Sequence, residues 1–221
     1  MNINNKTFFC SWSGGKDSCL SLYYALNQGG IPKRLITILI ENGKRSRSHG
    51  ISLNFLKKQS ESLNIPLCTC ATSWEGYENN FITALKEIKK SKINIGVFGD
   101  IDIEDHKNWV KKVCNKNNMV EYLPLWKKSR RKVVQEFIDC GFKAIIIAVK
   151  DKLLGKELLG REFDEDLLKI FEERGVDPAG ENGEYHTLVT GGPIFKSDIK
   201  YKLEEKIFFN GYWFQNVSLE K

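Results

Sequence analysis

Short apolar runs alternate with longer amphipathic stretches along most of the chain. The run Leu35–Ile40 contains only leucine and β-branched residues, which is typical of a parallel strand covered on both faces. Elsewhere apolar residues recur every three or four positions, as Phe81, Leu85 and Ile88 do, and this spacing predicts helices. Because strands that alternate with helices form βαβ units, the pattern predicts the α/β fold class with a parallel sheet.

The expected elements follow each other with short connections. Strands are expected at 8–11, 35–40, 66–71, 95–99, 119–123 and 144–149. Helices are expected from the turn at 13–18 to residue 27, and at 50–63, 78–90, 105–115, 129–140 and 164–174. The remainder is less regular, with a mixed segment at 151–163, a turn-rich segment at 177–193 and a closing hairpin of strands 207–210 and 212–217. A boundary near 123–128 divides the chain into domains 1–125 and 126–221.

Composition limits the class of protein. The 221 residues are 41% hydrophobic and 28% charged, which is ordinary for a globular protein. No apolar run approaches the roughly 20 residues of a membrane span, and the polar N-terminus lacks a signal-peptide pattern, so we expect a cytoplasmic protein with no membrane partner. The net charge of +6 is compatible with a nucleotide or nucleic-acid partner without requiring one.

The six cysteines are expected to be buried, reduced thiols. Most of them lie within apolar strand or helix patterns, and none belongs to a CxxC pair. Cys68 and Cys70 are two positions apart and would point to the same face of a strand. A zinc site would need further ligands at suitable spacing, and the chain has only three histidines.

The first strand leads into a turn with the composition of an anion site. Its residues are Ser13, Gly14, Gly15, Lys16, Asp17 and Ser18. Adjacent glycines allow the backbone to approach a ligand, and the following helix start supplies N–H groups and a positive dipole end. Lys16 can add a point charge, the two serines can donate hydroxyl hydrogen bonds, and Asp17 lies near the helix start or near a metal such as Mg²⁺.

The spacing of this turn excludes two common nucleotide loops and matches a third. The Walker A loop needs GxxxxGK[ST] and the dinucleotide loop needs GxGxxG, and neither is present. SGGKDS instead resembles SGGxDS, the pyrophosphate loop of the N-type ATP pyrophosphatases. The resemblance implies that ATP is split between its α and β phosphates, that an oxygen is activated as an adenylate, and that a nitrogen or sulfur nucleophile displaces AMP. Mg²⁺ and backbone donors would stabilise the departing phosphates.

A second cluster of chemically active residues lies in the segment 177–195. Glu181, Glu184 and His186 occur within six residues and are flanked by glycines that permit tight bends. A glycine-rich surface loop with scattered acids is the structural alternative. Two carboxylates and an imidazole beside so many glycines favour a site.

The two segments together resemble the diphthine–ammonia ligase family, in its short prokaryotic form. GENGEYHT followed by GGPIF is similar to the family's C-terminal signature, and 97–110, 122–126, 136–147 and 158–164 agree with it as well. The resemblance covers the chain from Phe8 to Phe195. It implies a Rossmann-like (HUP-type) sheet as the ATP-binding domain over 1–125, and a smaller α+β subdomain over 126–221 that carries GENGEYHT and binds the substrate.

The resemblance also implies roles for individual residues. Ser13–Ser18 would hold the pyrophosphate part of ATP, with Lys16 and Asp17 among the catalytic residues. The adenosine would be faced by four residues near strand ends and their loops: Leu39, Glu41, His49 and Asp100. The acceptor side would be lined by Glu181, Glu184 and His186, of which either of the last two would remove a proton from the incoming amine.

The acceptor is left open by the sequence. The family's founding reaction amidates the carboxylate of diphthine on elongation factor 2 with ATP and ammonia. The segment DIDIEDHKNWV differs from the glutamine–arginine pattern of that branch, so a small-molecule carboxylate such as a corrinoid side chain is a second candidate. Free ammonia or a primary amine is favoured as donor because no glutaminase-type segment is present. A homodimer is compatible with the sequence.

Two other functions stay open. KKSRRK at 127–132 has five basic residues, and positive charge near a helix N-terminus is unfavourable by about 0.3–1 kcal/mol per charge unless an anion offsets it. This favours a tRNA-modifying enzyme of the same superfamily as an alternative, although a thiolase usually needs a CxxC or a relay cysteine. A solvated helix start is the structural interpretation. A non-catalytic adenine-nucleotide sensor is the alternative outside enzymes.

Overall fold

The computed structural model describes residues 1–220 and contains two compact units. The first consists of Met1–Ser13 and Asp17–Lys127, and the second of Gly14–Lys16 and the chain from Lys128 onward. Three residues of the predicted phosphate turn therefore belong to the second unit, although they are bonded on both sides to the first. The division into an ATP-binding and a substrate-binding domain stays a prediction.

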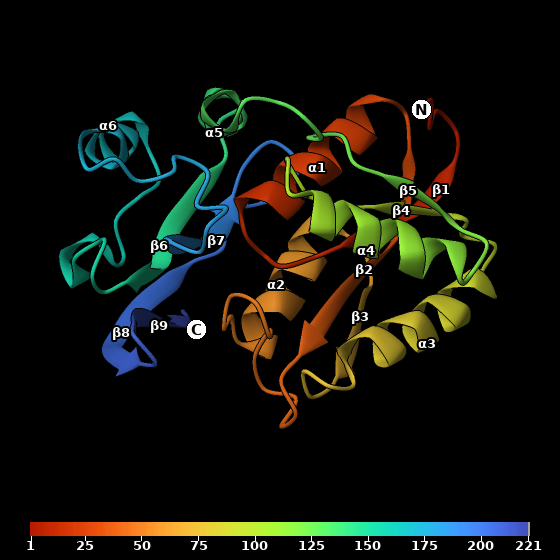
Figure 1. Cartoon of the computed structure of the whole chain (residues 1–221), viewed down its shortest axis with the longest axis horizontal. Coiled ribbons are helices and arrows are strands. Elements are labelled where there is room, and N and C mark those ends of the chain that lie inside the picture. Colours follow the sequence, from red (N-terminus) through yellow and green to blue (C-terminus); the bar gives the residue numbers. More distant parts are fainter. Residues whose placement is uncertain (221) are drawn as a thin grey trace. The chain divides into compact units, whose positions relative to one another are not determined.

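A parallel sheet of five strands forms the centre of the first unit (Figure 1). In spatial order the strands are β3 (Leu67–Ala71), β2 (Ile31–Leu39), β1 (Thr7–Ser11), β4 (Ile95–Val97) and β5 (Val120–Tyr122). The helices are α1 (Lys16–Asn27), α2 (Leu53–Leu63), α3 (Tyr77–Lys89) and α4 (Glu104–Asn115). Figure 1 shows α1 and α2 on one side of these strands and α3 and α4 on the other. The predicted α/β class with a parallel sheet is confirmed.

Alternating side chains of the strands build the core of this unit. Phe9 and Ile36 point to the side of α3 and α4, where Phe81 and Val113 are buried with them. Complete burial of such a side chain contributes about 1.5–3 kcal/mol. Trp12 follows β1 on the other side, and its Nε1 donates a 2.9 Å hydrogen bond to Oε1 of Gln59 on α2.

The strand order reverses at β1, because β2 and β3 lie on one side of it and β4 and β5 on the other. At such a reversal the connections leave the carboxyl ends of the two central strands in opposite directions and open a crevice. Gly99, just after β4, lies against the first turn of α1: a Cβ placed on it would be 2.9 Å from the carbonyl carbon of Asp17. A residue without a side chain is therefore required there, and it brings Asp100 close to the start of α1.

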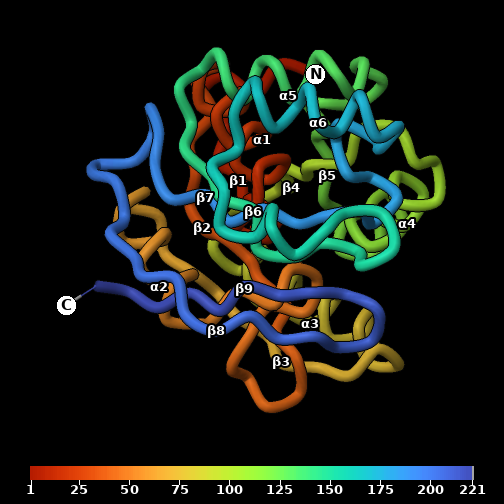
Figure 2. The backbone as a smooth tube through the Cα atoms, turned by 90° about the vertical axis from the view of Figure 1, so that its left-hand side faces the viewer, coloured from red at the N-terminus to blue at the C-terminus, as the bar shows by residue number. Residues whose placement is uncertain are grey.

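An antiparallel sheet of four strands forms the second unit. In spatial order its strands are β7 (Tyr185–Gly191), β6 (Lys143–Lys150), β9 (Tyr212–Leu219) and β8 (Tyr201–Phe209). The helices are α5 (Arg130–Asp139), the 3₁₀ turn η1 (Lys156–Leu158) and α6 (Glu165–Glu173). Figure 2 shows β8 and β9 side by side as the closing hairpin, which begins and ends beyond its predicted bounds. The predicted α+β architecture of this part is confirmed.

The prediction of a turn-rich segment over 177–193 is wrong for its second half. Residues 185–191 form β7, which pairs with β6 over most of its length. Turns were predicted because glycines lie on either side of this segment. Its residues Tyr185, Thr187 and Val189, however, are aromatic or β-branched and therefore favour a strand. The hydrogen bonds and packing offered by β6 decide the outcome.

The prediction that all six cysteines are buried is also wrong for three of them. Cys10, Cys19 and Cys114 are buried, but Cys68, Cys70 and Cys140 are partly exposed. Cys68 and Cys70 lie on β3, which is an edge strand of the first sheet, so one side of that strand has no neighbouring strand to cover it. All six thiols are free.

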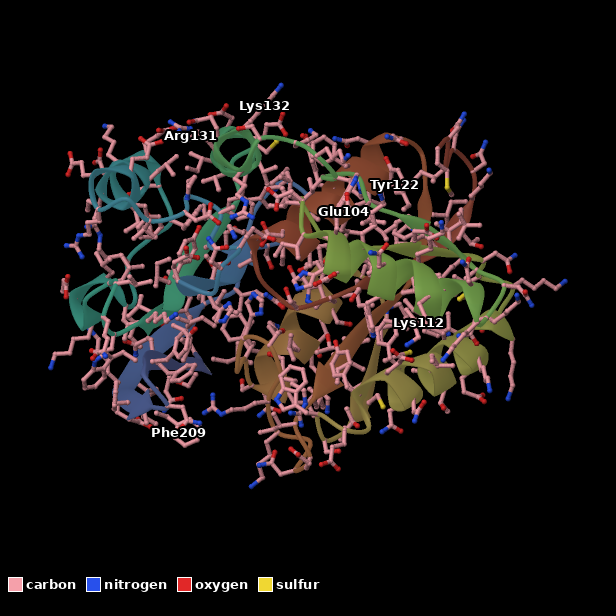
Figure 3. The ribbon with its side chains drawn as sticks, in the orientation of Figure 1. Glu104, Lys112, Tyr122, Arg131, Lys132 and Phe209 are labelled. Atoms are coloured by element: carbon pink, nitrogen blue, oxygen red, sulfur yellow. The ribbon has the colours of Figure 1, made fainter. Side chains whose placement is uncertain are left out.

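Several large apolar side chains of the closing hairpin are exposed. Phe209 is 63% exposed at the end of β8, and Figure 3 shows its ring pointing away from the ribbon. A bulge between Leu203 and Lys206 interrupts the ladder with β9 in the middle of β8. Bulges and charged residues on an edge strand hinder pairing with another strand. Among the described residues, no helix is both long enough and apolar enough to cross a membrane.

Candidate active site

The phosphate turn joins β1 to α1 with a backbone shape that depends on glycine. Gly14 has a φ of +82°, in the left-handed region that residues with a side chain rarely adopt. The hydroxyl oxygens of Ser13 and Ser18 are 3.0 Å apart across the turn. Asp17 lies in the first turn of α1, where a carboxylate is favourable beside the helix dipole. The turn therefore has the shape and helix start that the sequence predicted for an anion site.

A pocket opens in the first unit at the carboxyl ends of the central strands. It is lined by residues that follow β1, residues of β2 and residues of two later loops: Ser11, Trp12, Ser13, Ile36, Thr37, Ile38, Arg47, Ser48, Trp74 and Tyr77. Thr37 fixes one wall, because its hydroxyl donates a 2.5 Å hydrogen bond to the carbonyl of Trp12. The lining combines aromatic rings with a few polar groups, which is the usual composition of a small-molecule site.

Arg47 is the charged residue of this pocket, and its side chain is only 7% exposed. It donates to the carboxylate of Glu41 at 2.8 Å and to the carbonyl of Thr72, and its guanidinium carbon lies 5.0 Å from the centroid of the Trp74 ring. Its Nε is buried and has no hydrogen-bond partner within the described chain. A ligand that offers an acceptor to this N–H would complete its hydrogen bonding.

The residues predicted to face the adenosine occupy different places around this pocket. Leu39 is buried in the core, and the pocket begins at residues 36–38 of the same strand. Glu41 is exposed and pairs with Arg47; its pKa is lowered by a hydrogen bond from its own backbone and by that arginine. His49 is half-buried, and its Nδ1 lies 3.0 Å from the hydroxyl of the pocket residue Ser48.

Asp100 lies near the start of α1 rather than among the pocket residues. Its carboxylate is 3.5 Å from Nδ1 of His106. Together with burial, which has the larger effect, its charge raises the pKa of the Tyr77 hydroxyl. Asp100 is therefore close enough to the pocket to influence one of its rings. Tyr77 stays neutral and able to donate a hydrogen bond at neutral pH.

Of the residues that line the pocket, only Ser13 was among the predicted site residues, and the large side chains that the sequence analysis missed are Trp12, Arg47, Trp74 and Tyr77. A signal for the aromatic ones existed. Trp12 follows β1 directly, and Trp74 and Tyr77 follow β3, so all three lie at strand carboxyl ends, where ligands bind in parallel sheets. Arg47 had no such signal, because its place depends on the path of the loop between β2 and α2.

In the second unit, the middle of the phosphate turn lies against β7. The backbone N–H of Lys16 donates a 3.0 Å hydrogen bond to the hydroxyl of Thr187, and the N–H of Val189 donates one of 3.0 Å to the carbonyl of Gly14. The Lys16 ammonium donates to the carbonyl of Ala179 and lies 5.2 Å from the centroid of the Tyr185 ring. The predicted phosphate turn and the GENGEYHT segment are thus in direct contact.

Carboxylates in the second segment hold its turns in shape. Asp177 accepts hydrogen bonds from the N–H groups of Ala179 (3.0 Å) and Glu181 (2.9 Å), and forms a 2.6 Å ion pair with Arg130. Glu184 is buried and accepts from the backbone and the side chain of Asn182, at 3.0 and 3.1 Å. The Glu184 carboxylate therefore stabilises this turn, whatever further role it has.

His186 is the titratable group of β7 with a large shift. Burial, which has the larger effect, and the positive charge of Lys16 together lower its pKa from 6.5 to about 4. The imidazole is consequently neutral at physiological pH. It can accept a proton there without first having to lose one.

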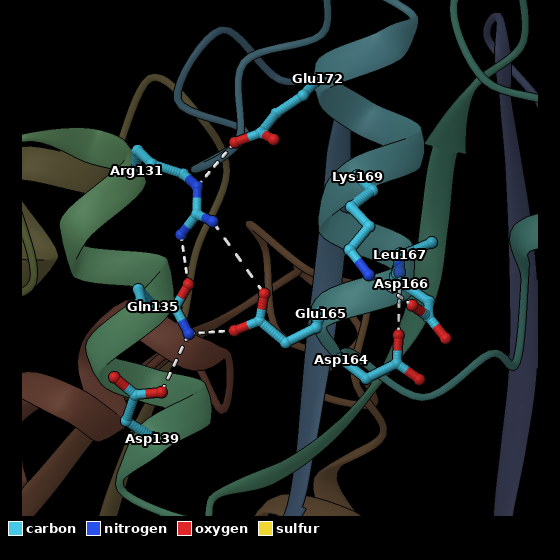
Figure 4. A network of polar contacts seen from close by, with 9 residues as sticks. All are labelled: Arg131, Gln135, Asp139, Asp164, Glu165, Asp166, Leu167, Lys169 and Glu172. Carbon is cyan, nitrogen blue, oxygen red and sulfur yellow. Dashed lines mark hydrogen bonds and ion pairs between the residues drawn. The ribbon is translucent and has the colours of Figure 1, made fainter.

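Acidic residues of the same unit pair with the basic cluster 127–132 (Figure 4). Within Figure 4, Arg131 contacts Glu172 at 2.6 Å and Glu165 at 4.0 Å, which links α5 to α6. The other pairs are Lys128 with Glu136 at 2.9 Å, Lys132 with Glu136 at 4.0 Å, and Arg130 with Asp177 at 2.6 Å. Carboxylates of the chain itself thus offset the charge that favoured an RNA partner.

One carboxylate at the start of α1, that of Asp17, has the chemistry to help hold a magnesium ion that arrives with a nucleotide. Within residues 1–220 no three histidine, cysteine, aspartate or glutamate side chains are grouped so as to hold a metal. Mg²⁺ usually keeps several waters and binds through one or two carboxylates and the phosphates of its substrate. Asp17, half-buried at the start of the helix, is the carboxylate that would hold it.

Family models match both parts of the chain. The model "Diphthamide synthase N-terminal domain" matches residues 6–121, and "Diphthamide synthase C-terminal domain" matches residues 129–219. The diphthine–ammonia ligase of Mus musculus is 27% identical over 233 residues, covering 93% of this chain and 86% of the mouse protein. That of Schizosaccharomyces pombe is 25% identical over 209 residues, covering 85% of this chain and 34% of the yeast protein.

Two solved structures resemble this chain more distantly. A structure described as a predicted subunit of tRNA methyltransferase from Methanocaldococcus jannaschii has a TM-score of 0.47 and 18% identity, over 85% of this chain and 98% of its own. A 4-thiouridine synthetase bound to RNA and ATP has a TM-score of 0.45 and 13% identity, over 62% and 41%. At these TM-scores and identities, no activity or ligand of these two proteins is transferred to this chain.

Proposed function

The chain belongs to the diphthamide synthase family and is an ATP-dependent ligase, and from this premise we propose that it joins ammonia or an amine to a carboxylate through an acyl-adenylate. In the first step a carboxylate oxygen attacks the α phosphorus of ATP and pyrophosphate leaves. In the second step the nitrogen attacks the activated carbonyl, AMP leaves, and one proton is released. A carboxylate has no good leaving group of its own, so adenylation supplies one.

One observation carries the proposal: Gly14–Lys16 of the phosphate turn contact β7, the strand that begins with the last three residues of GENGEYHT. The two most specific segments of the sequence, far apart along the chain, are therefore parts of one arrangement. Phosphate chemistry and acceptor chemistry need this proximity, since the acceptor oxygen must reach the α phosphorus in line with the departing pyrophosphate.

ATP would be bound by its two ends. The pyrophosphate part would lie on the turn Ser13–Ser18, where N–H groups at the start of α1 and the Lys16 ammonium can stabilise its charge. To reach it, the ammonium would exchange the Ala179 carbonyl for a phosphate oxygen. The adenosine would enter the pocket with Trp12, Arg47 and Trp74. Mg²⁺ bound with the nucleotide would neutralise part of the developing negative charge.

His186 is the residue we propose as proton acceptor in the second step. When ammonia has attacked, its nitrogen is positively charged and more acidic than free ammonium, and the neutral imidazole of His186 would accept the proton as the adduct collapses to the amide. Glu181 would line the acceptor side with it. Glu184 is better suited to holding the turn, because Asn182 already occupies both of its carboxylate oxygens.

The acceptor we propose is the carboxylate of diphthine, which the names of the mouse and Schizosaccharomyces pombe relatives mention, on elongation factor 2 as in the founding reaction of the family. A small-molecule carboxylate is the other member of the same chemical class. In both cases free ammonia or a primary amine is the donor. The paired charges of the segment 127–132 give no support to an RNA acceptor.

An exchange assay tests this function. The chain is incubated with ATP, Mg²⁺ and radiolabelled pyrophosphate in the presence of diphthine-bearing elongation factor 2 or of small carboxylates, and label in ATP is counted. We expect exchange that depends on one carboxylate, and AMP as product once ammonia is added. Formation of ADP and phosphate, or ATP hydrolysis with no exchange for any carboxylate, would refute the proposal.

A further inference from the structure

The strand β7 contacts the phosphate turn at two alternate positions. At the first, the Thr187 hydroxyl accepts the N–H of Lys16; at the second, the Val189 N–H donates to the carbonyl of Gly14. The Gly14 carbonyl belongs to the peptide before Gly15, and the Lys16 N–H belongs to the peptide after it. Both peptide planes around Gly15 are therefore fixed by one strand.

Because the peptide bond is planar, these contacts determine the direction in which the Gly15 N–H points. In a trans peptide the C=O and N–H groups point to opposite sides. Because the Gly14 carbonyl points towards β7, the N–H of Gly15 in the same plane points away from it. Glycine is the residue with the widest choice of φ and ψ, so without these bonds the orientation of this N–H would be poorly defined.

Of the two contacts, the one to Thr187 depends on a side chain and can be removed by substitution. Thr187 is 1% exposed and Lys16 is 5% exposed, so water cannot easily replace the hydroxyl as acceptor. The other bond is between backbone groups and is insensitive to residue type. The identity of residue 187 therefore decides whether the second peptide is held.

We propose that Thr187 is a positioning residue for the pyrophosphate loop: by holding the Lys16 N–H it fixes the conformation of Gly15, so that the Gly15 N–H, which points away from β7, keeps a direction suited to the phosphates of ATP. The inference rests on the proposed function and adds to it a residue outside the titratable set Glu181, Glu184 and His186. It also makes β7 a strand with two tasks, since His186 on the same strand lies on the acceptor side.

The test compares binding of three probes to the full chain by calorimetry: ATP, inorganic pyrophosphate and adenosine. Thr187→Val removes the hydroxyl and keeps the volume, and Thr187→Ser restores it. Thr190→Val is the matched control, because Thr190 is a buried threonine of the same strand whose hydroxyl donates to the Lys143 carbonyl at 3.3 Å instead of to the loop. If T187V does not fold, T187A removes the same hydroxyl.

We expect T187V to weaken ATP and pyrophosphate about tenfold, or about 1.4 kcal/mol, and to leave the affinity for adenosine within twofold. T187S and T190V should bind all three probes like the wild type. Normal adenosine binding also reports that a variant is folded. Equal loss of adenosine and ATP, or a T187V that binds ATP normally, would overturn this inference alone. A wild-type chain that binds neither ATP nor pyrophosphate would overturn the proposed function with it.

Discussion

Replacement of His186 by Asn should change how the stability of the protein depends on pH. In the folded chain the pKa of this imidazole is about 4, against an ordinary value of 6.5. Between these values the unfolded chain binds a proton that the folded chain does not, so stability falls as the pH falls through this window and is fully regained above it. The whole shift corresponds to about 3 kcal/mol, and about 2 kcal/mol of it is lost between pH 7.5 and pH 5.

The assay is urea unfolding followed by tryptophan fluorescence at pH 7.5 and at pH 5. The wild type should lose about 2 kcal/mol more than H186N over this interval, because Asn cannot take up a proton. The control variant is His106→Asn, since the His106 side chain is 57% exposed and gives up little hydration on folding. It should follow the wild type. If H186N and the wild type lose the same free energy of unfolding, the imidazole is not desolvated as described, and its role as a neutral proton acceptor loses its basis.

Two further substitutions test the supports of the site. Arg130→Met should lower the free energy of unfolding by about 1–3 kcal/mol in urea titrations, because the largely buried Asp177 loses its charged partner; Lys132→Met, at a 69% exposed side chain, should stay within about 0.5 kcal/mol, and equal effects would contradict the argument. Arg47→Met should weaken ATP about tenfold in calorimetry by removing the guanidinium beside Trp74, and an unchanged affinity would exclude this pocket as the adenosine site.

The sequence predicted the parallel sheet and the phosphate turn because both depend on local information. Apolar runs of strand length recur between amphipathic stretches, and SGGKDS has a fixed spacing after a strand. The segment at 185–191 was predicted as turns because its neighbouring glycines are local, whereas its pairing with β6 is not. Local patterns thus gave the elements and missed one strand that needs a distant partner.

The contacts of the site depended even more on tertiary structure. Thr187 is an ordinary strand residue in the sequence, and only the packing of Lys16 against β7 gives its hydroxyl a partner. Likewise, KKSRRK is a run of positive charge until α5 and α6 pack together and Arg131 meets Glu172 and Glu165. Titratable residues near glycines can be found from a sequence. The hydrogen bonds and ion pairs that join segments far apart in the chain cannot.

The membership of Gly14–Lys16 in the second unit has a consequence for how such a protein can be divided or inherited. A fragment that ends at Lys127 would contain every residue of the pyrophosphate loop and the whole parallel sheet, yet it would lack the Thr187 hydroxyl and the Val189 amide. Such a fragment would keep the nucleotide-binding fold, but the conformation of its pyrophosphate loop would not be held by hydrogen bonds to β7. Gene fusion or recombination at the boundary would therefore separate the loop from β7, which holds its conformation. We expect the two parts to be inherited together.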